Sequence, residues 1–255
     1  MNTIVNSLAV FLLSAVLVGC VTTTNQQPID TEAAYNKRID LGMKYLEVGK
    51  RDNARYQFTR ALKYKKDSAP AYQGIAMVHE ANGETEPARD AFKKALKLAD
   101  ESNRSGINVS YGQFLMKEGK NEEACPLFEE AANDYDFSFR ADALYLAGKC
   151  AEKTGKVARV RSAYEHALNI NPNYGPALAD LAEIYFAAGE YPQAKRLIDQ
   201  LERVSKPSAK SLWLGIRIER IFGNKDKEAS YAVALKNMHP YSKEYLEYKR
   251  LLEKK

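Results

Sequence analysis

The chain has 255 residues, of which 38 are Lys or Arg and 33 are Asp or Glu, giving a formal net charge of +5. Basic and acidic residues are interleaved along the chain and form no basic block of the kind that binds nucleic acid, so we expect no nucleic-acid partner. Beyond the N-terminal segment, roughly 220 residues remain, enough for one extended repeat array or one to two globular domains.

Residues 1–19 differ in composition from the rest of the chain. The stretch from Ile4 to Val18 is largely apolar, and the first charged side chain is Asp30. This stretch is shorter than the roughly 20 apolar residues that span a bilayer, and no basic flank follows it. We therefore interpret residues 1–19 as a secretory signal peptide. An uncleaved anchor helix is the alternative, because bacterial signals normally open with Lys or Arg and this one does not.

The signal peptide ends in Leu17-Val18-Gly19-Cys20, which resembles the lipobox of bacterial lipoproteins. The resemblance implies that Cys20 is lipidated with a diacylglyceryl group and a further acyl chain such as palmitate. Two or more acyl chains hold a protein at a membrane without a spanning helix. Val21 follows the cysteine in place of Asp, which by the same resemblance implies transport to the outer membrane. We expect a lipid-anchored protein that faces the periplasm.

The segment after the cysteine is polar, carries no charge before Asp30 and shows no helical periodicity. Such a composition is typical of a short flexible tether. We therefore divide the chain into a signal peptide (1–19), a tether (20–31) and a folded part (32–255).

An internal repeat organises the folded part. Residues 41–61 and 75–95 superpose with a shift of 34 residues, which aligns Gly49 with Gly83 and Phe58 with Phe92. This period and this order of small and large residues resemble the tetratricopeptide repeat, in which a glycine-bearing turn joins two antiparallel helices. Further copies follow with turn glycines at Gly119, Gly155, Gly189 and Gly223.

The six copies differ in spacing and in regularity. The third and fourth each begin 36 residues after their predecessor, so we expect the extra residues in turns. The sixth copy shifts its register by about one residue after Gly223, as terminal repeats that cap an array often do.

The repeated residue types have a packing reason. A small residue at the eighth repeat position, such as Gly42 or Ala76, lets two helices approach closely, and a large residue such as Phe58 fills the space beside it. Because one hairpin cannot bury its apolar face alone, successive hairpins must stack. We predict an all-α solenoid of about six tetratricopeptide hairpins, and the resemblance implies a right-handed superhelix.

The sequence offers little that could perform catalysis or bind a metal. His79, His166 and His239 each occupy ordinary repeat positions and are not spaced to share a metal ion. We find none of the motifs that mark hydrolases, zinc proteases or nucleotide-binding loops. We therefore expect no enzyme activity, no small-molecule substrate, no metal, and no cofactor beyond the covalent lipid on Cys20.

Cys125 and Cys150 remain once Cys20 is assigned to lipidation. They fall in the second helix of the third repeat and the first helix of the fourth, which pack against each other in such arrays. Two thiols in an oxidising compartment favour a disulfide, and we predict one here. Two reduced, buried thiols are the alternative.

The inner face of the array is the predicted binding surface. In tetratricopeptide arrays, first-helix positions two, five, nine, twelve and thirteen line this face. Flexible methionines and exposed apolar side chains there suit peptide capture. The alternative is that the N-terminal helix or tether covers the patch. The predicted partner-binding residues are Asn36, Ile39, Met43, Leu46, Gln73, Met77, Glu80, Gln113 and Met116.

The C-terminal stretch adds a more specific resemblance. Its segments Ser211–Arg220, Gly223–Asp226, Ala229–Tyr231 and Pro240–Ser242, together with the lipobox, the six repeats and the paired cysteines, resemble the type IV pilus biogenesis and stability lipoprotein family of PilF and PilW type. The resemblance implies a pilotin, which binds subunits of the pilus secretin and promotes their outer-membrane localisation, assembly or stability. The alternative function is a periplasmic adaptor for peptidoglycan hydrolases or other envelope machinery.

Overall fold

The computed structural model describes residues 30–253, and within this range the chain is entirely helical, with thirteen helices and no strand. This confirms the predicted all-α solenoid. Its first six helices are α1 (Thr31–Glu47), α2 (Arg51–Tyr64), α3 (Ala69–Ala81), α4 (Thr85–Leu98), α5 (Glu101–Lys117) and α6 (Asn121–Asn133). The others are α7 (Arg140–Lys153), α8 (Val157–Ile170), α9 (Gly175–Ala187), α10 (Tyr191–Val204), α11 (Ala209–Ile221), α12 (Lys225–Met238) and α13 (Lys243–Glu253).

Helices α1 to α12 pair into six consecutive hairpins, one for each sequence repeat. The turn within the first hairpin contains Gly49 at a φ of 71°, a left-handed backbone conformation that favours glycine. The five equivalent glycines of the other hairpins adopt the same conformation, with φ between 71° and 78°. The six glycines therefore lie in the turns that the repeat pattern predicts.

The contact between small and large residues is close around Phe58. This fully buried ring lies between Gly42 of α1 and Gly74 of α3. A Cβ atom added to either glycine would stand 2.4 Å from the ring, too close for any carbon contact. The glycines thus let one aromatic side chain of α2 fill the space between two neighbouring first helices.

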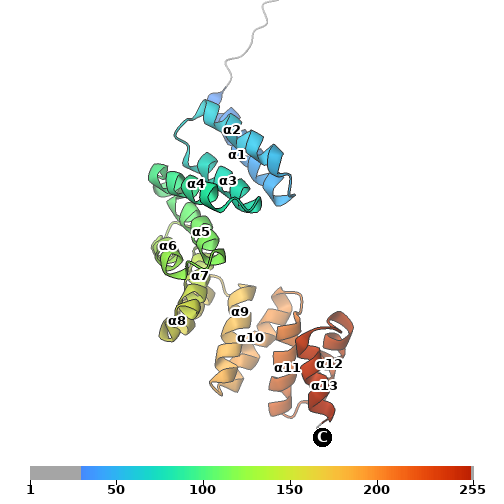
Figure 1. The fold of residues 1–255 in the computed structure, drawn as a ribbon. Helices are drawn as coiled ribbons and strands as arrows, with labels where there is room; N and C mark the ends of the chain where they lie inside the picture. The colour runs from blue at the N-terminus through green and yellow to red at the C-terminus, as the bar shows by residue number, and fades with distance from the viewer. Residues whose placement is uncertain (1–29, 254–255) are drawn as a thin grey trace, which may run out of the picture.

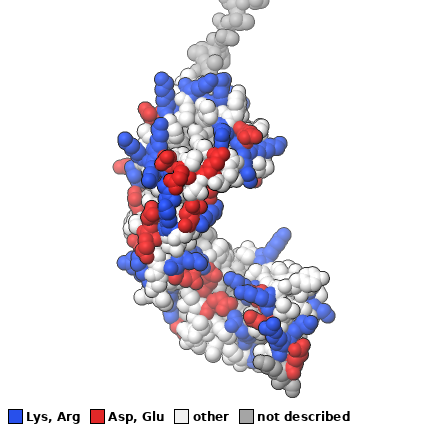
Figure 2. Space-filling model, viewed as in Figure 1, with Lys and Arg blue, Asp and Glu red and all other residues white. Residues whose placement is uncertain are grey.

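The hairpins stack in sequence order along a curved path (Figure 1). In the first three repeats, α3 packs on both α1 and α2, and α5 packs on both α3 and α4. At the next junction α7 packs mainly on α6, and at the following one α9 packs on α8. The space-filling view shows the resulting arc, hollowed on one side, with charges of both signs spread over the surface (Figure 2).

The structure revises the expected positions of the extra residues. Between the second and third repeats, α5 starts early, at Glu101, where the side chain of Asp100 and that of Asn103 form a capping box. The insertion therefore lengthens a helix instead of a turn. Between the third and fourth repeats, residues 134–139 do form a longer turn.

Helix α1 begins at Thr31, one residue before the predicted boundary, and the Asp30 side chain accepts hydrogen bonds from the backbone N–H groups of Glu32 and Ala33. At the other end, α13 follows the sixth hairpin and packs on α11 and α12.

The signal peptide, Cys20 and residues 21–29 lie outside the described residues, so their assignment stays a prediction. No helix within residues 30–253 is both long enough and apolar enough to cross a membrane.

Candidate functional site

A groove lies on the inner face of the first three repeats, and we call it the methionine groove. It has a volume of about 470 Å³ and is formed mainly by α1, α3 and α5. The structure thus brings together four of the predicted partner-binding residues, which are Met43, Leu46, Met77 and Glu80. The other lining residues are Glu47, Ala81, Phe114, Lys117 and Glu118.

The apolar side chains of this groove are held from behind by the core. Met43 and Leu46 pack against the cluster that contains Phe58, and Met77 packs against the cluster around Phe92. All three remain partly exposed, so each presents apolar surface to the groove. Such half-buried side chains are positioned in advance and lose little conformational freedom when a partner covers them.

The rim of the methionine groove is predominantly acidic. Lys117 donates to the Glu80 carboxylate at 2.5 Å and neutralises it. Within the described residues, Glu47 and Glu118 form no ion pair. An apolar floor with two unpaired carboxylates at its edge suits an apolar segment that carries a basic side chain.

The remaining predicted groove residues lie elsewhere. Ile39 packs against the Phe58 cluster and Met116 against the Phe92 cluster, while Asn36 is exposed. The Gln73 side chain is occupied, because its amide donates to the Ser110 hydroxyl at 2.8 Å and so links α3 to α5. Gln113 lines a second groove, between α5, α7 and the start of α9. Equivalent repeat positions therefore do not all open into one site.

The second groove was not predicted, and we call it the aromatic groove. It has a volume of about 460 Å³ and lies between α5, α7 and the start of α9. Phe137 and Phe139, from the long turn at 134–139, form part of its wall together with Tyr145 and Tyr174. Two aromatic residues within the extra length of the third repeat were the sequence signal that could have revealed it.

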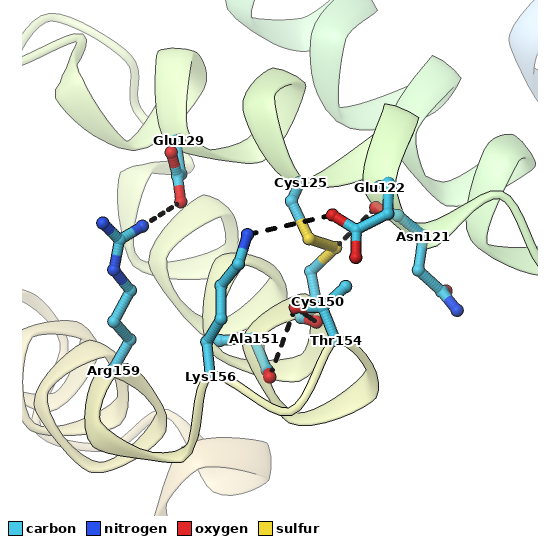
Figure 3. The surroundings of a disulfide bond; sticks show 9 residues. All are labelled: Asn121, Glu122, Cys125, Glu129, Cys150, Ala151, Thr154, Lys156 and Arg159. Carbon is cyan, nitrogen blue, oxygen red and sulfur yellow. Dashed lines mark hydrogen bonds and ion pairs between the residues drawn. A yellow bond between two sulfur atoms is a disulfide. The ribbon is translucent and has the colours of Figure 1, made fainter.

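The cysteine pair lies at the junction of the third and fourth repeats. The structure joins Cys125 of α6 to Cys150 of α7 in a disulfide, with Cα atoms 5.5 Å apart (Figure 3). Both residues are buried. Two ion pairs from α6 to the following helical hairpin flank the bond, Glu129 with Arg159 at 2.9 Å and Glu122 with Lys156 at 3.9 Å. The junction at which α7 packs mainly on α6 is thus tied covalently.

The histidines have structural surroundings. His79 hydrogen-bonds the carboxylate of Glu84, an interaction that lowers the pKa of Glu84. His239 places its Nε2 atom 3.1 Å from the carbonyl oxygen of Pro207, and His166 is exposed on α8. The described residues contain no group of three or more His, Cys, Asp or Glu side chains that could hold a metal ion.

Comparison with known proteins identifies the repeat and the family. Tetratricopeptide repeat profiles match residues 39–103 and 151–209. The chain is 31% identical over 248 residues to the type IV pilus assembly protein PilF of Pseudomonas aeruginosa, a match that spans 96% of this chain and 98% of the relative.

Solved structures agree with this match. The structure of Pseudomonas aeruginosa PilF aligns with a TM-score of 0.80 and 29% identity, covering 86% of this chain and 98% of that one. The structure of PilW, a type IV pilus biogenesis factor, aligns with a TM-score of 0.68 and 24% identity, covering 84% of this chain and 97% of that one, and supports the fold. The chain belongs to the PilF family of tetratricopeptide-repeat proteins of type IV pilus biogenesis.

Proposed function

We propose that this protein is a pilotin, an outer-membrane lipoprotein that binds subunits of the type IV pilus secretin and promotes their localisation, assembly or stability. In this function it is a binding protein and catalyses no reaction. The observation that carries the proposal is the methionine groove, an apolar and acidic-rimmed surface on the inner face of a chain that is similar to PilF over nearly its whole length.

The groove can supply the affinity that such a function needs. Covering Met43, Leu46 and Met77 with partner side chains removes apolar surface from water, and each well-buried partner side chain contributes about 1.5–3 kcal/mol. Two or three such anchors contribute about 3–9 kcal/mol before the cost of association is subtracted, so the groove alone supports binding weaker than about 1 μM, which corresponds to roughly −8 kcal/mol.

The predicted lipid anchor adds a second affinity. A lipidated Cys20 would hold the groove at the membrane surface, so that a captured partner segment is concentrated there without further contacts. Membrane attachment and groove binding are therefore separable parts of the function.

The groove is tested with Met43→Glu in the full chain, since a charge on the apolar floor would have to be desolvated on binding. We expect at least about tenfold less secretin to co-purify from solubilised membranes. Val48→Glu is the matched control, because Val48 ends the same helix, is 66% exposed and does not line the groove. Circular dichroism checks that both variants fold.

Equal secretin recovery with both variants would contradict the groove assignment. Recovery of a peptidoglycan hydrolase in place of secretin would overturn the proposal in favour of the envelope adaptor.

The anchor is tested with Cys20→Ala, which should move the protein from the membrane fraction to the soluble periplasmic fraction. Unchanged membrane fractionation would contradict the lipid anchor while leaving the groove result unaffected.

A further inference from the structure

The aromatic groove is lined by residues of three consecutive repeats. From α5 it takes Gly106, Val109 and Gln113, and from α7 it takes Asp142, Tyr145 and Leu146. Because Val109, Gln113, Asp142 and Tyr145 stand at first-helix positions five, nine, two and five, the groove opens on the same inner face as the methionine groove. Helix α5 is a wall of both grooves.

The long turn gives this groove its character. At 134–139 it is two residues longer than the turns at 65–68 and 171–174. Phe137 is half-buried against the cluster of Ala131, Ala132 and Ala143, which fixes the base of the turn. Phe139 is 64% exposed, and its ring centroid lies 5.9 Å from that of Phe137 at an interplanar angle of 61°. The turn therefore holds an exposed phenyl ring at the groove edge.

A second pair of rings also lines the groove. Tyr145 and Tyr174 pack edge to face, with centroids 5.5 Å apart and an interplanar angle of 68°. Their hydroxyl groups donate to carboxylates of the chain itself, Tyr145 to Asp180 at 2.9 Å and Tyr174 to Asp142 at 3.0 Å. Burial and these carboxylates raise the pKa of both phenols. With the hydroxyls engaged, the rings offer the groove mainly their apolar carbon surface.

The lining is almost free of charge. Among its residues Asp142 is the only Asp or Glu and none is Lys or Arg, and Asp142 already accepts the Tyr174 hydrogen bond. This contrasts with the acidic rim of the methionine groove. Electrostatic complementarity therefore favours an uncharged occupant. Gln113 is exposed and hydrogen-bonds no other described residue, so its amide can donate to a peptide carbonyl.

We propose that the aromatic groove binds an uncharged, proline-containing segment of a partner protein in the extended polyproline II conformation. Proline rings are flat, apolar and uncharged, and they pack against aromatic faces. The polyproline II backbone has no internal hydrogen bonds, so its carbonyl groups are free to accept from a donor such as Gln113, and its stiffness lowers the entropic cost of binding. Two aromatic pairs that face one groove are the lining that such segments use.

The test is calorimetric titration of the full chain in detergent micelles with two acetylated and amidated nonapeptides. One repeats Ala-Pro-Pro and the other repeats Ala-Ser-Ser, so both are uncharged but only the first is stiffened by proline. We expect saturable binding of the proline peptide with a Kd below about 1 mM. The Kd of the serine peptide should be higher by about fivefold or more.

Phe139→Ala should weaken binding of the proline peptide by about fivefold or more, since truncation of a central aromatic residue has effects of this size. Tyr135→Ala is the matched control, because Tyr135 lies in the same turn, is 82% exposed and does not line the groove. Equal melting temperatures of the two variants would show that the loss of peptide affinity is a local effect and not a result of unfolding.

Two results would overturn the proposal. They are equal affinity for both peptides or no saturable binding, and an unchanged affinity in Phe139→Ala. Because the titration uses no secretin, each of these results leaves the secretin proposal intact, and loss of secretin capture in Met43→Glu leaves this one intact.

Discussion

The inner faces of the N-terminal half (α1–α6) and the C-terminal half (α7–α13) are built differently. In the N-terminal half, Met43 and Met77 face a groove with part of their surface uncovered. In the C-terminal half, charged side chains link successive first helices. Lys149 of α7 pairs with Asp180 of α9 at 3.3 Å, and Arg217 of α11 pairs with Glu183 of α9 at 3.1 Å.

This difference indicates where the inner face has surface available to bind a partner. Polar groups that are already satisfied within the chain gain little from a partner and must be desolvated to meet one, whereas exposed apolar surface gains free energy when it is covered. Lys149 illustrates the first case, because burial lowers its pKa but Glu152 and Asp180 more than offset this, leaving the pKa above its ordinary value. Beyond α7 the C-terminal half therefore mainly stabilises the array, whereas the N-terminal half offers the methionine groove and the aromatic groove lies at the boundary between the halves.

The largest expected effect is on the core of the N-terminal half. Phe58→Ala empties the space between Gly42 and Gly74 and should lower the free energy of unfolding by about 3–5 kcal/mol. Repeats contact only their neighbours, so we expect faster amide hydrogen exchange in α1–α4 and little change in α9–α12. Tyr56→Ala, at an exposed position of the same helix, is the control. Exchange that rises evenly along the chain would show that the halves do not behave separately.

The next effect concerns the junction between the halves. The disulfide closes a loop with a sequence separation of 25, so replacing both Cys125 and Cys150 with Ala should lower the free energy of unfolding by about 3 kcal/mol. Denaturant titration with and without reductant measures this. The wild-type protein should lose stability when the disulfide is reduced, and the double variant should not. If reductant leaves the free energy of unfolding of the wild-type protein unchanged, the disulfide assignment is wrong.

The smallest effect compares one ion pair from each half. Arg217 contacts both carboxylate oxygens of Glu183 and lies over the Phe186 ring at 4.5 Å, so Arg217→Ala should cost about 1–2 kcal/mol. Lys117 is 71% exposed beside Glu80, and Lys117→Ala should cost less than about 1 kcal/mol. Thermal denaturation compares the two. A larger loss of stability in Lys117→Ala than in Arg217→Ala would contradict the conclusion that the stabilising ion pairs lie in the C-terminal half.

The helices were predictable because their signals are local. A glycine such as Gly49 occurs at the same place in every copy, and its left-handed conformation ends a first helix wherever it occurs. The early start of α5 also had a local signal, the Asp100 and Asn103 capping pair, which the repeat alignment alone did not use.

The binding surface was only partly predictable, because it depends on how one repeat is rotated against the next. Met43, Leu46 and Met77 face one groove as their repeat positions indicate, and Phe114 joins them from a position not expected to face inward. Gln73 stands at an inward position, but its hydrogen bond to Ser110 occupies it. Contacts of this kind form between residues far apart in the sequence, and a repeat period carries no information about them.

Helix α13 determines where the stacking of hairpins stops. Tyr245 and Tyr248 pack on the apolar cluster of the sixth hairpin, and the Tyr248 ring meets Trp213 edge to face. A second molecule that approached this end would meet Lys243, Glu247, Lys249 and Arg250 on the outside of α13 in place of an open helical surface. The apolar end of the sixth hairpin is thereby covered by a helix whose exposed residues are mostly charged, an arrangement that disfavours head-to-tail stacking of a second molecule at this end.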